Sequence, residues 1–202
     1  MNFNGNFKDL GAFEISEIKH RIQSFKAEWD INQSRQERYK LFHGDSKNIF
    51  VTDVDAQWDG FGYPLVKHNI DEKLNELTAP IVQKLEAMLG GKVGKCLYIN
   101  LPAGKKVQPH VDLGYYLNSV HRCHIPIHTH ENISFTLGGE TIHMKEGMGY
   151  EINNSRTHSV DNDSNVDRIH LLIDIMPPHI FKSANTITSN TFTTNPNSIK
   201  FF

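Results

Sequence analysis

The sequence has few cysteines, no long apolar run and no marked excess of charge of one sign. Its 202 residues include two cysteines, which are too few for a disulfide framework and form no Cys-x-x-Cys pair. No apolar stretch approaches the roughly 20 residues that span a bilayer, and the opening MNFNGNFKDLGAFEI lacks the basic and apolar regions of a signal peptide. These absences predict a cytoplasmic protein with reduced thiols and no membrane partner.

The charge balance argues against a nucleic-acid partner. The formal net charge is -2, and the 21 lysines and arginines are scattered rather than gathered on one stripe. Hydrophobic residues make up 38% of the chain and charged residues 22%, which is typical of a globular protein with one sizeable core. We expect a single domain over residues 1–182, followed by a tail at 183–202 that is rich in Ser, Thr and Asn.

The N-terminal part of the chain is predicted to be helical with one hairpin. Apolar residues at spacings of three and four predict a helix over residues 15–29. An imperfect alternation around a Gly-Asp turn predicts a hairpin over residues 38–53. A second helix is expected to begin near Asn69, and Pro80 is expected to end it, with Thr78 capping a third helix.

The C-terminal part, residues 92–182, is dominated by short strands. They are rich in Ile, Leu, Tyr and Phe, and Gly, Asn, Asp or Pro separates them, with Gly138 and Gly139 as a hairpin turn. Many short strands after a few helices, without β-α alternation, indicate a sandwich or jelly roll rather than a parallel α/β sheet. The predicted fold is therefore mainly β with flanking helices, in which the helices of residues 1–91 pack outside a jelly-roll core.

The segment PHVDLGYYLNSVHRCHIPIHTH contains five histidines and the first candidate ligands. His110 and Asp112 are two residues apart, so on an extended chain their side chains point the same way. His158 follows after several predicted strands, a separation that can return the chain to the neighbouring edge of a jelly roll. Two histidines and one carboxylate on one face of a metal form the triad that suits non-haem Fe(II) oxygenases. We take these three residues as the candidate metal ligands.

Arg168 supports this interpretation. It lies ten positions after His158 and begins the predicted strand RIHLLIDI. A guanidinium can bind a carboxylate with two parallel hydrogen bonds. The cosubstrate 2-oxoglutarate is a keto diacid, which needs a chelated end and a salt-bridged end. Arg168 is thus a candidate for binding its distal carboxylate.

Four segments between about Tyr98 and Pro177 resemble the aspartyl/asparaginyl β-hydroxylase family of Fe(II)- and 2-oxoglutarate-dependent oxygenases. These segments are LPAGKKVQPHVD, HRCHIPIH, GMGYEINNSRTHSV and DRIHLLIDIMP, in family order and at family-like spacing. The resemblance implies a double-stranded β-helix, which is a jelly roll of the cupin kind. It also implies that the domain at residues 1–182 is an oxygenase domain.

The resemblance further implies roles for six residues. The iron ligands would be His110, Asp112 and His158, and the contacts to 2-oxoglutarate would be Arg122, His124 and Arg168. Some family members have glycine at the position of Asp112, so this chain carries the fuller triad. A serine that helps to hold the cosubstrate in some members aligns near Ile99, where Tyr98 or Asn100 could replace it.

The reaction that the resemblance implies is hydroxylation. Fe(II), 2-oxoglutarate and O2 together convert an unactivated carbon to an alcohol, and succinate and CO2 are released. Family members act on Asp or Asn residues in folded or peptide substrates, and relatives hydroxylate free amino acids such as proline. The membrane anchor and helical repeats of animal members are missing, which favours a free amino acid or small metabolite over a protein domain as substrate.

Three other functions stay open at the level of sequence: a metal-dependent cupin that does not use 2-oxoglutarate, a non-catalytic jelly-roll binding module, and a zinc protein built on the histidine-rich strand. Arg168 argues against the first, because such a site needs no distal clamp. The intact triad argues against the second. For the zinc protein, His121, His128 and His130 are instead expected to be exposed strand histidines.

Several positions have both a functional and a packing interpretation. Trp58, Tyr115 and Tyr116 are candidate substrate contacts, and each could equally pack at the edge of the core. His170 shares a strand face with Arg168. It is expected either to donate a hydrogen bond near the site or to be an ordinary core histidine.

Overall fold

The structure is a computed structural model that describes residues 3–32, 45–55, 57–58, 63–68 and 70–180. The predicted tail at 183–202 lies outside the described residues. The described strands are β1 (Phe7–Ala12), β2 (Lys47–Val54), β3 (Leu65–Lys67), β4 (Lys92–Leu101), β5 (Lys106–His110), β6 (His121–His128), β7 (Ile133–Leu137), β8 (Glu140–Ile142), β9 (Met148–Ile152), β10 (His158–Asn162) and β11 (Arg168–Met176). The described helices are α1 (Ser16–Gln23), α4 (Glu72–Leu89) and α5 (Tyr115–Ser119), with short 3-10 helices η1 (Ala27–Asp30) and η2 (Pro178–Ile180).

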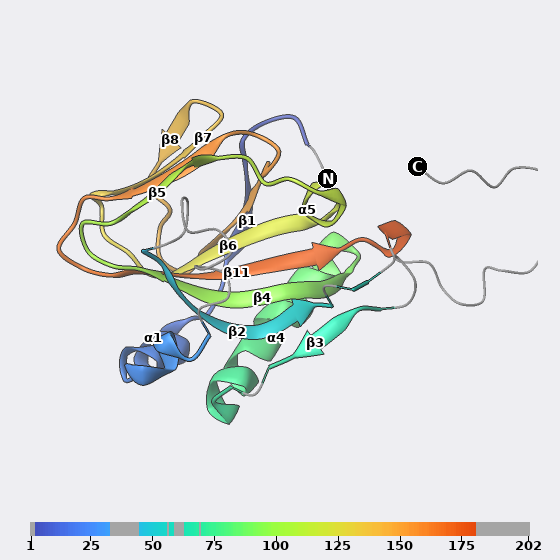
Figure 1. Cartoon of the computed structure of the whole chain (residues 1–202), viewed down its shortest axis with the longest axis horizontal. Helices are drawn as coiled ribbons and strands as arrows, with labels where there is room; N and C mark the ends of the chain where they lie inside the picture. Colours follow the sequence, from blue (N-terminus) through green and yellow to red (C-terminus); the bar gives the residue numbers. More distant parts are fainter. Residues whose placement is uncertain (1–2, 33–44, 56, 59–62, 69, 181–202) are drawn as a thin grey trace, which may run out of the picture.

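The strands form two antiparallel sheets that enclose a core. The larger sheet has the order β1-β9-β6-β11-β4-β2-β3, and the smaller sheet has the order β5-β10-β7-β8. The smaller sheet lies on one side of the larger sheet, and α1 and α4 lie on the other (Figure 1). Apolar side chains from both sheets, including Leu101, Val107, Phe135 and Val160, fill the space between them. The predicted jelly roll with flanking helices is confirmed.

The outer face of the larger sheet carries a second core under the helices. In α4, buried residues recur at spacings of three and four, and they include Leu74 and Leu85, which are fully buried. They pack with Tyr98 of β4 and with Ile18 of α1. Burying one such leucine contributes about 1.5–3 kcal/mol. This core packs the helices against one face of the larger sheet, and the other face of the sheet lines the barrel.

Both cysteines lie on this outer face, in different strands. Cys96 of β4 and Cys123 of β6 are each register partners of Ile173 in β11, which runs between them. Two strand spacings separate the thiols by roughly 10 Å, whereas a disulfide needs Cα atoms within about 7 Å. Both cysteines are accordingly free and buried.

Pro80 does not end a helix, contrary to the prediction. The helix α4 continues through Pro80 to Leu89, because the proline lies on the exposed face of the helix. There the carbonyl of Glu76, which loses its helical partner, can bond to water. The helix begins after Asp71, whose side chain accepts a 2.8 Å bond from the Leu74 amide. Asn69, the expected start, lies outside the described residues.

Thr78 is not a helix cap but a buried polar link between α4 and the sheet. Its hydroxyl donates to the carbonyl of Leu74 at 2.6 Å and lies 2.7 Å from the Tyr98 hydroxyl. Since the Thr78 proton is used within the helix, Tyr98 is the donor across the interface. The prediction of a third helix was wrong because the sequence does not show that Thr78 faces the sheet.

The first predicted helix is shorter than its apolar pattern. The helix α1 ends at Gln23, where Ser24 and Phe25 bond to carbonyls three residues back, as in a 3-10 turn. Trp29, which lies in η1, still packs into the outer core.

Of the hairpin predicted at 38–53, the structure describes β2, while residues 33–44 lie outside the described part. No described helix is both long and apolar enough to cross a membrane.

Candidate metal centre

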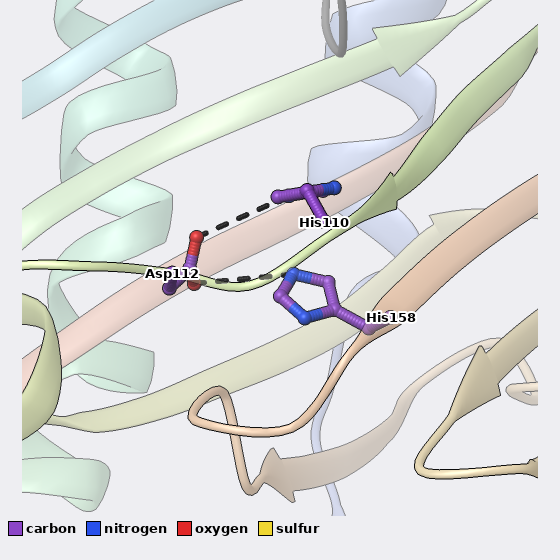
Figure 2. A group of neighbouring side chains, drawn as sticks. All are labelled: His110, Asp112 and His158. Atoms are coloured by element: carbon purple, nitrogen blue, oxygen red, sulfur yellow. Dashed lines mark ion pairs between the residues drawn. The ribbon is translucent and has the colours of Figure 1, made fainter.

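His110, Asp112 and His158 lie together at one end of the smaller sheet. His110 ends β5, His158 begins β10, and the two histidines are direct register partners. Nε2 of His110 is 3.9 Å from Oδ1 of Asp112, and Nε2 of His158 is 3.9 Å from Oδ2 of Asp112. The three side chains turn toward one another (Figure 2), and their ligand atoms all lie within 4.8 Å of one another. Such a group can hold one divalent cation.

Backbone carbonyls fix the orientation of both imidazoles. Nδ1 of His110 lies 2.8 Å from the carbonyl oxygen of Gln108, and Nδ1 of His158 lies 3.0 Å from that of Arg156. A carbonyl oxygen only accepts hydrogen bonds, so each Nδ1 carries the proton and each Nε2 presents its lone pair. This tautomer is the one that can bind a metal through Nε2.

The environment of His158 favours its neutral form. The residue is buried, and its ring stacks on Phe135 with the centroids 6.1 Å apart and the planes at 6°. Burial lowers the pKa of His158 below its usual value, although the carboxylate of Asp112 opposes the shift. A neutral imidazole is the form that binds metal. Phe135 was not singled out from the sequence, because one phenylalanine in a short strand carries no signal of its own.

Arg168 lies inside the barrel, next to the same phenylalanine. It begins β11 on the face that also carries His170, since side chains two apart share a face of a strand. Its guanidinium carbon is 6.0 Å from the centroid of the Phe135 ring, and Arg168 is 4% exposed. Phe135 therefore contacts both Arg168 and His158. The structure brings the predicted guanidinium and the predicted metal ligands to one part of the barrel.

Two buried imidazole nitrogens near Arg168 have no hydrogen-bond partner among the described residues. They are Nδ1 of His124 and Nε2 of His170, whose ring centroids are 5.9 Å apart. Nδ1 of His170 is 2.9 Å from Nη2 of Arg168. A guanidinium can only donate, so this Nδ1 accepts and Nε2 of His170 carries the proton. Buried polar atoms without partners are unusual, and a polar ligand bound here would satisfy them.

The pKa of His170 predicts how stability depends on pH. Burial and the neighbouring Arg168 charge lower this pKa well below 6.5. The folded chain thus binds fewer protons at His170 than the unfolded chain, so stability is full above pH 6.5 and falls as the pH drops below it. We expect this histidine to contribute a slope of about 1.4 kcal/mol per pH unit. Urea unfolding between pH 7.5 and pH 5 should show a shallower loss for His170→Gln than for wild type; equal slopes would contradict the assignment.

Arg122 forms ion pairs with two carboxylates, those of the candidate ligand Asp112 and of Asp174. Its Nη1 donates to Oδ2 of Asp112 at 2.5 Å, and its Nε and Nη2 donate to the two oxygens of Asp174 at 2.9 Å and 2.8 Å. Burial opposes the charge of Arg122, but the two carboxylates outweigh it and raise its pKa. Asp174 was missed from the sequence. The sequence does contain a signal for it: in RIHLLIDIM, Asp174 is the one acidic residue in the apolar segment after His170.

Other candidate residues lie elsewhere. The Tyr98 hydroxyl bonds to Thr78 on the helix side of the larger sheet, and Asn100, two residues on, donates to Asp167 at 2.9 Å. Both point away from the barrel interior, so neither replaces the serine of other family members. His121 is buried and not exposed as predicted, because it bonds to Glu151 at 2.6 Å.

The histidine-rich strand provides no zinc site in the described part of the chain. Among the described residues, His110, Asp112 and His158 are the one group of three or more His, Cys, Asp or Glu side chains spaced to share an ion. The side chains of β6 alternate between the two faces of the larger sheet, and Cys123 belongs to the outer core. This separation is what the alternation of the strand predicts.

A family model identifies the class of protein. The model described as aspartyl/asparaginyl beta-hydroxylase matches residues 14–178, which is most of the chain. The match and the fold are thus those of a hydroxylase. More specifically, the chain belongs to the aspartyl/asparaginyl β-hydroxylase family. A comparison with curated protein sequences finds no match.

Solved structures of other oxygenases share the fold. A prolyl-4-hydroxylase from Pseudomonas putida is similar with a TM-score of 0.54 at 10% identity, covering 86% of this chain and 94% of that one. A prolyl hydroxylase from Trichoplax adhaerens, in complex with a peptide of hypoxia inducible factor, has a TM-score of 0.52 at 10% identity, covering 88% and 86%. The non-heme monooxygenase ThoJ, in a nickel complex, has a TM-score of 0.52 at 13% identity, covering 86% and 74%.

Proposed function

We propose that this hydroxylase binds Fe(II) through His110, Asp112 and His158 and binds 2-oxoglutarate between the metal and Arg168. The observation that carries the proposal is the convergence of two imidazoles and one carboxylate within 4.8 Å, beside a buried guanidinium. With Fe(II), 2-oxoglutarate and O2 bound, one oxygen atom of O2 enters a substrate C–H bond and the other enters succinate, with loss of CO2. The residues of the chain would hold the reactants close together and in the orientation that this reaction needs.

The buried side chains beside Phe135 offer hydrogen-bonding groups for a dicarboxylate. The guanidinium of Arg168 can donate two parallel bonds to the distal carboxylate of 2-oxoglutarate, and the Nε2–H of His170 adds a donor that has no partner among the described residues. Burial and Arg168 lower the pKa of His124 well below its usual value, so this histidine is neutral. Its unpartnered Nδ1 supports a polar contact with the cosubstrate beside the metal. Because these groups are buried, their hydrogen bonds to a ligand would be stronger than in water.

The two tyrosines after the metal ligands have different roles in the proposal. Leu113 and Tyr115 lie one and three residues after Asp112 and are 77% and 66% exposed. We expect an apolar part of the substrate to cover them. Tyr116 is turned inward, where its hydroxyl accepts a 2.9 Å bond from the Lys95 amide, so it is not a substrate contact. Trp58 is half-buried and packs against a small apolar cluster, which favours its packing interpretation.

The substrate in this proposal is an amino acid, an amino-acid residue of a peptide, or a small metabolite. The name of the family refers to aspartyl and asparaginyl residues, and the related Trichoplax enzyme was solved with a peptide. We also propose one oxygenase domain over residues 1–182 in the cytoplasm. The core shared by the helices and the larger sheet supports the single domain, and the two free thiols fit a reducing compartment.

The test is 2-oxoglutarate turnover with the purified, Fe(II)-loaded protein. Succinate release would be measured with free amino acids in one set of reactions and with short Asp- and Asn-containing peptides in another, each with and without Fe(II). We expect one set to raise succinate release above the substrate-free level, in an Fe(II)-dependent manner, with a product heavier by one oxygen atom in mass spectrometry. Failure of the folded, iron-loaded protein to bind or consume 2-oxoglutarate would instead support a metal-dependent cupin that does not use this cosubstrate.

A further inference from the structure

Asp112 has a second buried partner besides the proposed metal. Its Oδ2 accepts a 2.5 Å hydrogen bond from Arg122, in a pair whose side chains are both about one-tenth exposed. The Asp112 amide donates at 3.3 Å to the carbonyl of Asn154, and the side chain of Asn154 donates at 2.7 Å to Leu117 of α5. The ligand carboxylate is therefore held by its side chain and its backbone before any metal binds.

Arg122 is in turn fixed by Asp174 on the neighbouring strand. The two residues are direct register partners in β6 and β11. Their two parallel hydrogen bonds, at 2.9 Å and 2.8 Å, orient the guanidinium plane, and Asp174 is fully buried. A bidentate pair of this kind leaves Arg122 one direction in which to point its Nη1, and Asp112 lies there.

Tyr116 contacts Asp174 and extends the network. Its hydroxyl accepts a bond from the Lys95 amide, so its own proton is free to be donated to the Asp174 carboxylate. Burial and the Asp174 carboxylate both raise the pKa of Tyr116, which keeps it a neutral donor. The hydroxyl fits here because position 94 is glycine: a Cβ at Gly94 would overlap it. Gly94 has an ordinary φ, so its need for glycine comes from this close approach.

The charges of the network explain why Asp174 is needed. Arg122 alone would neutralise Asp112 and leave the ligand group without net negative charge. With Asp174 present, the buried group of two carboxylates and one guanidinium carries a net charge of about −1, which attracts a divalent cation. We infer that Arg122, Asp174 and Tyr116 are positioning residues that orient Asp112 and keep its charge available to the metal. This inference rests on the proposed metal site, and it gives Arg122 a role through Asp112 in addition to any contact with the cosubstrate.

The inference is tested by metal affinity, which does not depend on turnover. Mn(II) binding to metal-free protein would be titrated by electron paramagnetic resonance for wild type, Asp174→Asn and Tyr116→Phe. Loss of a residue that orients a metal ligand typically weakens metal binding about 10- to 100-fold. We expect a loss in this range for Asp174→Asn and a smaller but measurable loss for Tyr116→Phe. The visible spectrum of the Co(II) form should change in both variants.

A matched control is Glu151→Gln, which removes the same charge from another buried ion pair. Glu151 is 2% exposed and bonds to His121, the residue before Arg122, on the opposite face of the sheet. We expect this variant to lose thermal stability but to bind Mn(II) like wild type. Equal affinity of wild type, Asp174→Asn and Tyr116→Phe, or an equal loss in Glu151→Gln, would overturn the inference. If Asp174→Asn does not fold, wild-type affinity in Tyr116→Phe alone overturns it.

Asp112→Asn separates this failure from failure of the proposed function. If Asp112→Asn binds Mn(II) as tightly as wild type, then the proposed metal site is wrong, and the positioning network falls with it. If Asp112→Asn loses affinity while Asp174→Asn does not, the metal site stands and the positioning role alone is rejected.

Discussion

Replacement of His158 by alanine is expected to abolish succinate formation from 2-oxoglutarate. The variant would leave His110 and Asp112 as the two remaining ligands of the proposed metal. Even a residue that only orients a ligand typically contributes about 10- to 100-fold to metal affinity or activity, so we expect the loss of a ligand to exceed about 100-fold. The measurement is succinate release with an accepted substrate, together with the iron content of the protein after desalting.

His121→Gln is the matched control for this experiment. His121 is also a buried histidine, but it lies on the outer face of the larger sheet, where it bonds to Glu151. The glutamine amide can still donate to Glu151. We expect iron content and succinate release to stay near the wild-type values. A His158→Ala protein that keeps its iron and its activity would remove His158 from the site.

Replacement of Arg168 by alanine is expected to raise the 2-oxoglutarate concentration that the enzyme needs. The guanidinium is buried, and nothing else among the described residues of β11 on its face carries a positive charge. Truncating one partner of a buried, hydrogen-bonded charge pair costs about 2–5 kcal/mol, which corresponds to a rise of about 30-fold or more. The measurement is the concentration of 2-oxoglutarate that gives half-maximal turnover.

Two variants show whether this loss reflects recognition of the carboxylate. Arg168→Lys keeps the charge but not the two parallel donors, so its requirement for 2-oxoglutarate should lie between those of wild type and Arg168→Ala. Arg21→Ala removes an arginine that pairs with Asp71 outside the barrel, and it should leave the requirement unchanged. An unchanged requirement in Arg168→Ala would exclude Arg168 from the cosubstrate pocket.

The proximity of the three candidate ligands could be predicted from the sequence because it depends largely on local spacing. His110 and Asp112 are two apart in an extended segment, and this spacing fixes their common direction whatever the rest of the fold does. Predicting that His158 lies beside them required a further assumption about the fold, namely that a jelly roll returns the chain to a neighbouring edge. In the structure the register of β5 and β10 pairs His110 with His158, and Asp112 lies close to both. The role of the three residues as metal ligands stays a prediction.

The residues around the candidate metal centre could not be predicted in the same way. Arg122 meets Asp174 because β6 and β11 are neighbours in one particular register, and a shift of one residue would turn Asp174 to the other face. Arg122 and Asp174 are 52 residues apart in the sequence, so their contact depends on the folded sheet and not on local spacing. The direction of Tyr98 toward Thr78 depends likewise on how α4 lies against β4.

In the helices, tertiary packing outweighs the local sequence preferences. Proline is costly inside a helix, which is why Pro80 was expected to end one. In the fold, Leu74 and Leu85 on either side of it are fully buried against the same sheet. Their burial, about 1.5–3 kcal/mol each, is of the size needed to offset the missing hydrogen bond. The sequence alone does not say that both leucines face one sheet.

We propose above all that Fe(II) and 2-oxoglutarate bind together at His110, Asp112, His158 and Arg168. The most direct measurement is the visible charge-transfer absorption of the Fe(II)–2-oxoglutarate complex, recorded without oxygen on the iron-reconstituted protein. We predict a weak band in wild type that is absent in His158→Ala and needs far more 2-oxoglutarate in Arg168→Ala. The absence of this band in folded, iron-loaded wild-type protein at high 2-oxoglutarate would contradict the account.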